Sequence, residues 1–171
     1  RLAGRHVPEP EAPPDAERIL RTLTEHEVDY VLIGGLAMRV HGSVERYTAV
    51  VEVVFAPEPA NLARLAAALR DLEAKVLNPG QEDFEIDAKM LPRATLWQFS
   101  TPDGGVDVMH EVPGGRPYAE LSERALRVRL GDIEIPVVDL DDLIQMKLAR
   151  ARPVDLADVA ALTDPRVEGA D

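Results

Sequence analysis

The sequence contains no cysteine, which excludes disulfide bonds and thiolate metal sites. It has no run that approaches the roughly 18 apolar residues of a membrane span, and its first residues lack the apolar segment of a signal peptide. These absences fit a protein of the reducing cytoplasm, where we expect it, and no membrane is expected among its partners.

Basic residues are scarce relative to acidic ones. The sequence has 19 Lys and Arg against 31 Asp and Glu, which gives a formal net charge of −12. Non-specific binding to nucleic acid depends on Lys and Arg that neutralise phosphates. The charge therefore disfavours RNA as an acceptor or partner, unless a local basic groove exists.

The length of 171 residues fits one domain, and 46% hydrophobic residues allow that domain to bury a core. Residues 1–14 hold four prolines and little apolar content, which predicts an extended or disordered leader. We expect a single domain over residues 15–165 and a tail over residues 166–171.

Hydrophobic patterns predict helices and strands that are interspersed along the chain. Apolar, β-branched or alternating runs predict strands at 30–35, 49–56, 94–100, 106–112 and, as a hairpin about Gly131 and Asp132, 127–138. Helical spacing predicts helices at 15–27, 36–41, 60–76, 139–151 and 154–162, with a loop and short helix in 114–126. Residues 77–93 predict no clear element. This order predicts an α/β (α+β) fold with a mixed sheet, flanking helices and a C-terminal helical segment.

A Gly-Gly pair joins the first predicted strand to a helix. Gly34 and Gly35 would let the backbone approach a ligand closely, and free N–H groups at a helix start can bind phosphate. A tight strand-to-helix turn without a ligand explains a lone pair of glycines equally simply, so the motif needs support from its neighbours.

Two acids interrupt apolar strands downstream of these glycines. Glu52 lies in "AVVEVVFA", and Asp107 lies in "GGVDVMHEV", on the opposite strand face from Val106 and Val108. Carboxylates on neighbouring strands can hold a divalent cation that polarises phosphate. The simpler alternative is that each acid lies on an edge strand or faces solvent, because an unpaired buried carboxylate is costly.

The ordered motifs resemble small nucleotidyltransferase-fold proteins of the MNT and AbiEii-type group, which includes toxin–antitoxin components. The resemblance rests on "VLIGGLAMRVHGSVERYTAVVEVVF", "STPDGGVDVMHEVPGG" and "VVDLDDLIQMKLARARPVDLADVAAL", and it covers about residues 18–162. It implies nucleotide binding with Mg²⁺ or Mn²⁺. It places Gly34, Gly35 and Thr48 at the nucleotide, and Glu52 and Asp107 at the metal, with Glu52, Asp107, Lys147 and Asp155 as catalytic candidates.

Val50 departs from this pattern, because the family places its first acid there. An isopropyl group cannot bind a hard cation, and Glu52 is one methylene longer than the usual aspartate, which moves its carboxylate outward by roughly 1.5 Å. Mg²⁺ requires near-octahedral oxygen ligands, so the site is expected to bind it weakly. Lys147 as a solvated side chain and Asp155 as a helix cap are the structural alternatives to their catalytic roles.

Three functions stay open at this point. The first is a family member that binds NTP with weak or no nucleotidyl transfer, a pseudoenzyme, and Val50 favours it. The second is an active nucleotidyltransferase that uses Glu52 and Asp107, with Lys147 neutralising the triphosphate. The third is a toxin–antitoxin-type protein-interaction module whose cleft no longer binds nucleotide.

Overall fold

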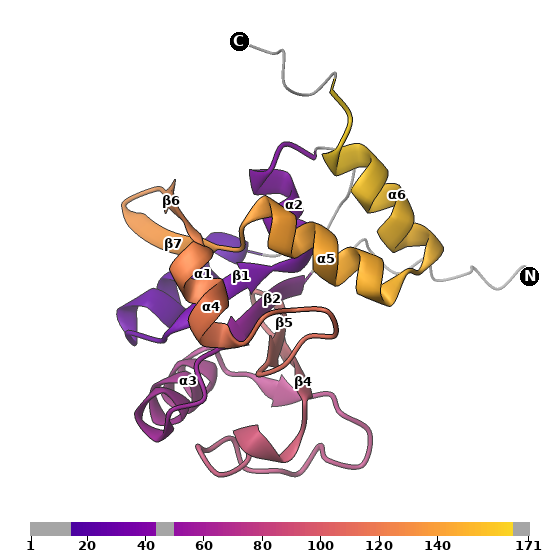
Figure 1. Cartoon of the computed structure of the whole chain (residues 1–171). Coiled ribbons are helices and arrows are strands. Elements are labelled where there is room, and N and C mark those ends of the chain that lie inside the picture. Colours follow the sequence, from indigo (N-terminus) through magenta and orange to yellow (C-terminus); the bar gives the residue numbers. More distant parts are fainter. Residues whose placement is uncertain (1–14, 44–49, 166–171) are drawn as a thin grey trace, which may run out of the picture.

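The computed structural model describes residues 15–43 and 50–165, which fold around one mixed β-sheet (Figure 1). The strand order across the seven-stranded sheet is β3-β4-β5-β2-β1-β7-β6. The strands are β1 Tyr30–Ile33, β2 Val50–Phe55, β3 Lys75–Val76, β4 Leu96–Thr101, β5 Gly104–Met109, β6 Leu126–Leu130 and β7 Ile133–Val137. Two pairs are parallel, β1 with β7 and β2 with β5, and the other pairs are antiparallel. The expected mixed sheet with flanking helices is therefore confirmed.

Helices cover both faces of this sheet. They are α1 Ala16–Glu25, α2 Gly34–Val40, α3 Pro59–Asp71, α4 Tyr118–Arg124, α5 Leu140–Arg150 and α6 Pro153–Leu162. Helix α1 contacts α3, β2 and β7, whereas α2 contacts β1, β2 and α5, and α4 contacts β1. In the described part of the chain, no helix is long and apolar enough to cross a membrane.

Helix α1 begins where the sequence predicts and ends earlier. The Asp15 side chain accepts a hydrogen bond from the Arg18 N–H at 3.0 Å, which satisfies one of the free donors of the first turn. The helix stops at Glu25 rather than near Glu27, because Glu27 adopts a left-handed conformation with φ of 55°. The Asp15 cap therefore fixes the start of α1, and the predicted end was two residues too long.

The sheet centre is buried because its strands are apolar on the face toward α1 and α3. Val51, Val53 and Phe55 of β2 are buried there, as are Val106 and Val108 of β5. Alternation along each strand sends the intervening side chains to the opposite face. Glu52 and Asp107 are among those intervening residues, and their face is the one that α2, α4 and α5 flank.

Residues 77–93 pack as an irregular segment against this core. The Phe84 ring lies 5.9 Å from the ring of Trp97, and the Arg93 guanidinium lies 5.0 Å from the centre of the Phe84 ring. The Trp97 indole donates a hydrogen bond to the Leu91 carbonyl at 3.0 Å, within a short 3₁₀ turn at Leu91–Arg93. The segment therefore seals the outer part of the core without forming a long element of its own.

Both predicted hairpins are present. Strands β4 and β5 pair from Leu96 with Met109 to Thr101 with Gly104, and strands β6 and β7 turn about Gly131. Gly131 has a φ of 63°, a value that glycine adopts with little strain. The strand expected over 106–112 ends at Met109, and the chain then loops toward α4.

Candidate functional site

Glu52 and Asp107 lie side by side at the centre of the sheet. They are in-register partners on the parallel strands β2 and β5, which places their backbones about 4.8 Å apart on one face. Both residues are half-buried. The register joins two acids that lie more than fifty residues apart in the sequence, and it excludes a sheet-edge position for either.

Burial and repulsion both act on the Asp107 carboxyl. Burial raises its pKa most, the neighbouring charge of Glu52 raises it further, and a hydrogen bond from the Gln98 side chain opposes them, so that the pKa reaches about 6. A cation placed between the two carboxylates would stabilise their charged forms and lower the pKa of Asp107. The pair is thus electrostatically suited to a bound cation or a shared proton.

The glycine turn lies directly against Glu52. Gly34 has a φ of 72°, and a Cβ built on it would overlap the Glu52 carboxylate. The Gly35 N–H lies 3.4 Å from Glu52 Oε2, a long hydrogen bond at the first turn of α2. Gly34 is therefore needed both for its left-handed backbone and for the space that Glu52 occupies.

Val50 lies on the same face one pleat before Glu52, paired in register with Gly105. Its isopropyl group offers no oxygen ligand at the position where the resemblance places the first acid. Thr48, also implied by the resemblance, lies outside the described residues. Asp103 does not replace the missing acid, because it forms an ion pair at 3.2 Å with Arg18 on α1.

Lys147 and Asp155 belong to the contact between α5 and α6. The Lys147 ammonium is buried, 2.7 Å from Asp158 and 3.9 Å from Asp155. The expectation of a solvated Lys147 side chain is wrong, because these two acids draw the ammonium into the helix interface. Both catalytic candidates are thus committed to buried ion pairs in this structure.

Asp155 caps the last helix, as one of its two predicted roles requires. Its Oδ2 accepts from the Arg152 N–H at 3.2 Å, and the Arg152 guanidinium donates to both carboxylate oxygens at 2.7 and 3.1 Å. The Arg152 guanidinium accounts for most of the lowering of the Asp155 pKa to about 2. Asp155 is fully buried, so this capping box fixes where α6 begins.

Arg152 and Gln98 were missed by the sequence-based prediction. The pKa of Arg152 is raised chiefly by its hydrogen bond to Asp155, and the charge of Glu52 contributes too, which places this exposed cation within electrostatic range of the acid pair. Gln98 pairs in register with Asp107 from β4, and its side chain lowers the Asp107 pKa. The "RPVD" motif was a signal for Arg152, whereas a single polar residue in an alternating strand gave none for Gln98.

The oxygen donors fit one hard divalent cation better than two. Carboxylate oxygens are the ligands that Mg²⁺ and Mn²⁺ prefer, and Mg²⁺ is commonly held by one or two carboxylates together with substrate phosphates. Over residues 15–43 and 50–165 there is no group of three or more His, Cys, Asp or Glu with metal-site geometry. His41, one of four histidines, hydrogen-bonds the Val138 carbonyl at 2.7 Å instead.

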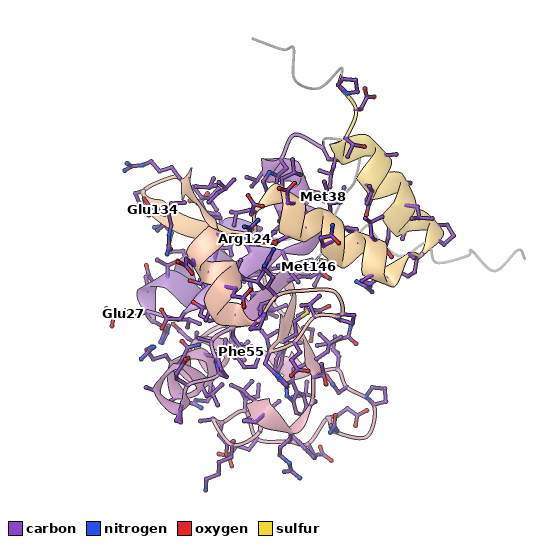
Figure 2. The ribbon with its side chains drawn as sticks, viewed as in Figure 1. Glu27, Met38, Phe55, Arg124, Glu134 and Met146 are labelled. Atoms are coloured by element: carbon purple, nitrogen blue, oxygen red, sulfur yellow. The ribbon has the colours of Figure 1, made fainter. Side chains whose placement is uncertain are left out.

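Helices α2, α4 and α5 flank the face that carries the acid pair. Figure 2 labels Met38 on α2 and Met146 on α5, both of them buried, and Arg124 on α4. Arg124 and Arg116 each donate to the buried Asp142 of α5 at 2.8 Å. These bonds connect α4 and the loop before it to α5, so ion pairs as well as packing stabilise the helices that flank the site.

A half-open cavity of about 510 Å³ lies beyond the ends of β2 and β5. It is lined by Glu58 before α3, by His110 and Glu111 after β5, and by Arg116 and Tyr118 at the start of α4. Neither Glu52 nor Asp107 is among the residues that line it. The cavity is therefore separate from the carboxylate pair, although it is reached along the same two strands.

A mixed sheet with a glycine turn after the first strand, and with paired carboxylates on its central parallel strands, defines a nucleotidyltransferase-type protein. Residues 15–163 match the family described as nucleotidyltransferase of unknown function, DUF6036, and the chain belongs to that family. The match does not single out the MNT or AbiEii-type group. No curated protein matches the sequence.

Solved structures with the same fold include two antibiotic-modifying enzymes. Lincosamide antibiotic adenylyltransferase LnuA, bound to lincomycin, superposes with a TM-score of 0.59 at 15% identity, over 86% of this chain and 94% of that one. ANT(2″)-Ia in complex with adenylyl-2″-tobramycin gives 0.55 at 15% identity, over 89% and 90%. An antigenic nucleotidyltransferase-like protein from Paracoccidioides brasiliensis gives 0.52 at 14% identity, over 88% and 78%. At these identities the likeness establishes the fold.

Proposed function

We propose that the protein binds a nucleoside triphosphate together with one divalent cation, and that it transfers the nucleotidyl group weakly or not at all. The observation that carries this proposal is the in-register pair of Glu52 and Asp107 with Val50 one pleat away. Two carboxylates supply enough ligands for one cation shared with phosphate oxygens. They leave no protein ligand for a second cation at the Val50 position.

Each part of the site has a distinct role in this proposal. Glu52 and Asp107 hold the cation, which when bound neutralises phosphate charge and polarises the phosphorus centre. Arg152 supplies positive charge on the side of Glu52, and Asp155 fixes its guanidinium through two hydrogen bonds. The role of Lys147 is structural, because its buried ion pair with Asp158 holds α6 in place.

We assign the binding of the triphosphate to Arg152 rather than to Lys147. The Arg152 side chain is 48% exposed, whereas the Lys147 side chain is 9% exposed and in contact with two acids. Neutralisation of a triphosphate by Lys147 would require its buried ion pair with Asp158 to open, which is costly. The exposed guanidinium can bind phosphate without that loss.

Nucleotidyl transfer, where it occurs, requires an acceptor. A small molecule is the acceptor class to test before RNA, because the net charge of −12 opposes non-specific RNA binding. Two proteins of the same fold act on antibiotics, according to their names, and this supports a small polar acceptor as a starting point. The cytoplasm is the expected compartment for either acceptor.

A protein-interaction module of the toxin–antitoxin type is the second candidate. The surface of α6 supports it: the helix buries its two acids and exposes Val154 and Leu156, whose exposed fractions are 38% and 50%. These side chains leave apolar surface on the last described helix, which a protein partner would cover. This candidate predicts that substitution of Leu156 by Lys weakens a partner complex without affecting nucleotide binding.

Label transfer from each of the four NTPs, labelled at the α-phosphate, tests the proposal. The native chain is compared with Val50→Asp and with Val50→Asp combined with Asp107→Ala, in Mg²⁺ or Mn²⁺ with RNA, protein and small-molecule acceptors. We expect transfer by Val50→Asp at least about 100-fold above the native chain, since a lost metal ligand costs several kcal/mol of barrier. We expect no transfer by the double variant.

Efficient transfer by the native chain would contradict the proposal and favour the active enzyme. Nucleotide binding is measured in parallel by calorimetry, because a missing acceptor silences transfer and leaves binding intact. If no NTP binds to the native chain or to Val50→Asp, the proposed nucleotide site fails and the interaction module is the better candidate.

A further inference from the structure

Three polar side chains form a row across three neighbouring strands. Glu52 of β2 pairs in register with Asp107 of β5, and Asp107 pairs in register with Gln98 of β4. In-register partners project to the same face of a sheet. The two flanking rows on this face contain no acid: Val50, Gly105 and Ser100 on one side, and Val54, Met109 and Leu96 on the other.

The Gln98 side chain lies beside Asp107, because the two residues pair in register and project to the same face of the sheet. Interaction with the Gln98 side chain lowers the Asp107 pKa, as an amide N–H directed at the carboxylate does. A primary amide has two N–H donors and one carbonyl acceptor, so donation to Asp107 leaves the carbonyl oxygen available on the same face of the sheet. The row therefore offers two carboxylates and one amide oxygen side by side.

The backbone of Gln98 is fixed from the outer side by residues that follow β3. The Gln98 N–H donates to the Asn78 side-chain carbonyl at 2.8 Å, and the Gln98 carbonyl accepts from the Leu77 N–H at 2.8 Å. The Asn78 amide also donates to the Leu96 carbonyl at 2.9 Å. Asn78 thus extends the pairing of β4 beyond the two-residue strand β3, and it holds Gln98 at the row.

We propose that Gln98 is the third oxygen ligand of the cation site, so that the site is the row of Glu52, Asp107 and Gln98. Hard divalent cations such as Mg²⁺ and Mn²⁺ accept amide carbonyl oxygens together with carboxylates. The ligand that Val50 cannot supply from β2 is then supplied from β4, on the other side of Asp107. This inference rests on the proposed function, because it adds a ligand to the cation site of Glu52 and Asp107.

The test is Mn²⁺ binding to the full chain, followed by electron paramagnetic resonance with and without ATP. The variants are Asp107→Asn, Gln98→Ala and Gln98→Glu. Ser100→Ala and Ser100→Glu are matched controls, because Ser100 lies on the same strand and face, one row away and opposite Gly105. Fluorescence of the buried Trp97, the single tryptophan, verifies that each variant is folded.

We expect Asp107→Asn to abolish Mn²⁺ binding and Gln98→Ala to weaken it about tenfold, the lower end of the range for groups around a metal. Gln98→Glu cannot donate to Asp107 but can coordinate, so it should bind Mn²⁺ at least as tightly as the native chain. Ser100→Ala should match the native chain, and Ser100→Glu should tighten binding less than Gln98→Glu, since its added charge lies outside the row.

Two results would overturn the assignment of Gln98 while the cation site stands: loss of binding in Asp107→Asn with native affinity in Gln98→Ala, or equal weakening in Gln98→Glu and Gln98→Ala. The second result would mean that Gln98 only orients Asp107. Absence of Mn²⁺ binding to the native chain, with or without ATP, would overturn the cation site itself and this inference with it.

Discussion

The ionisation of Asp107 makes the stability of the chain depend on pH. Its folded-state pKa of about 6 lies above its ordinary value of 3.8. A carboxyl with a raised pKa contributes its full stability below the unfolded value, where it is protonated in both states. That contribution is lost as pH rises through about 6, because the folded chain must then hold a charged carboxylate beside Glu52.

Asp107→Asn is therefore expected to become more stable relative to the native chain as pH rises. The two chains should unfold at similar urea concentrations near about pH 4, and the variant should unfold at the higher concentration near about pH 8. Urea titrations in the presence of a chelator provide the measurement. A stability difference that does not change between these pH values would show that Asp107 titrates normally.

Gly34 is the second residue with a measurable consequence. Gly34→Ala places a Cβ on a left-handed backbone, which costs about 1–2 kcal/mol, and it drives that Cβ into the Glu52 carboxylate. Gly80→Ala is the matched control, since Gly80 has a φ of 76° and open space around its Cβ position. Chemical denaturation should show a larger loss for Gly34→Ala, and Glu52→Ala in the Gly34→Ala background should remove the excess.

The two acids of the site could be identified from the sequence, whereas the residues that contact the site could not. Glu52 and Asp107 could be identified because each is a single acid in an apolar strand, where an unpaired buried carboxylate would be costly. Gln98 was not visible, because an exposed polar residue is ordinary in an alternating strand and only the β4–β5 register brings it to Asp107. Lys147 looked like a solvated side chain because its partner Asp158 lies on a separate helix.

Helix α6 is unusual among the elements because its charged residues are the buried ones. Asp155 and Asp158 face Lys147 and Arg152, while Val154 and Leu156 face solvent. Helices α5 and α6 lie beside each other at the C-terminal side of the fold (Figure 1), and ten residues are enough for only about three turns. Ion pairing rather than apolar burial therefore fixes this helix.

Lys147→Met is expected to destabilise the chain by about 3–5 kcal/mol, because it removes one partner of the buried ion pair between Lys147 and Asp158. Lys147→Met combined with Asp158→Leu should recover much of that loss, because replacement of a complete buried pair by apolar residues is often neutral. Urea denaturation of both variants provides the measurement. A single variant as stable as the native chain would show that the pair is not desolvated.

Helices and strands were predicted correctly where the hydrophobic periodicity is strong. The prediction failed for a strand that depends on pairing with residues distant in the sequence. The β4–β5 and β6–β7 hairpins follow from alternating runs on either side of glycine turns. The helix expected over 60–76 ends at Asp71. Lys75 and Val76, which were expected in that helix, form the two-residue strand β3 because they pair with Ser100 and Phe99. The order of strands across the sheet likewise depends on contacts that no local pattern contains.

At the scale of the whole molecule, the single sheet predicts cooperative unfolding. Residues 15–165 were expected to form one domain, and buried side chains from both ends of that range belong to one apolar cluster. Trp97 fluorescence and far-ultraviolet circular dichroism should therefore give coincident urea transitions. Transitions separated by more than the experimental error would show that the chain contains two independently folding parts.

The parallel contact between β2 and β5 also bears on how fast the chain folds. Paired residues of these two strands lie 55 positions apart in the sequence, so the centre of the sheet closes a long loop before it gains its contacts. Proteins dominated by such non-local contacts refold more slowly than helical bundles of similar size. Because Glu52 and Asp107 are brought together by this closure, the acid pair forms only when the two strands pair.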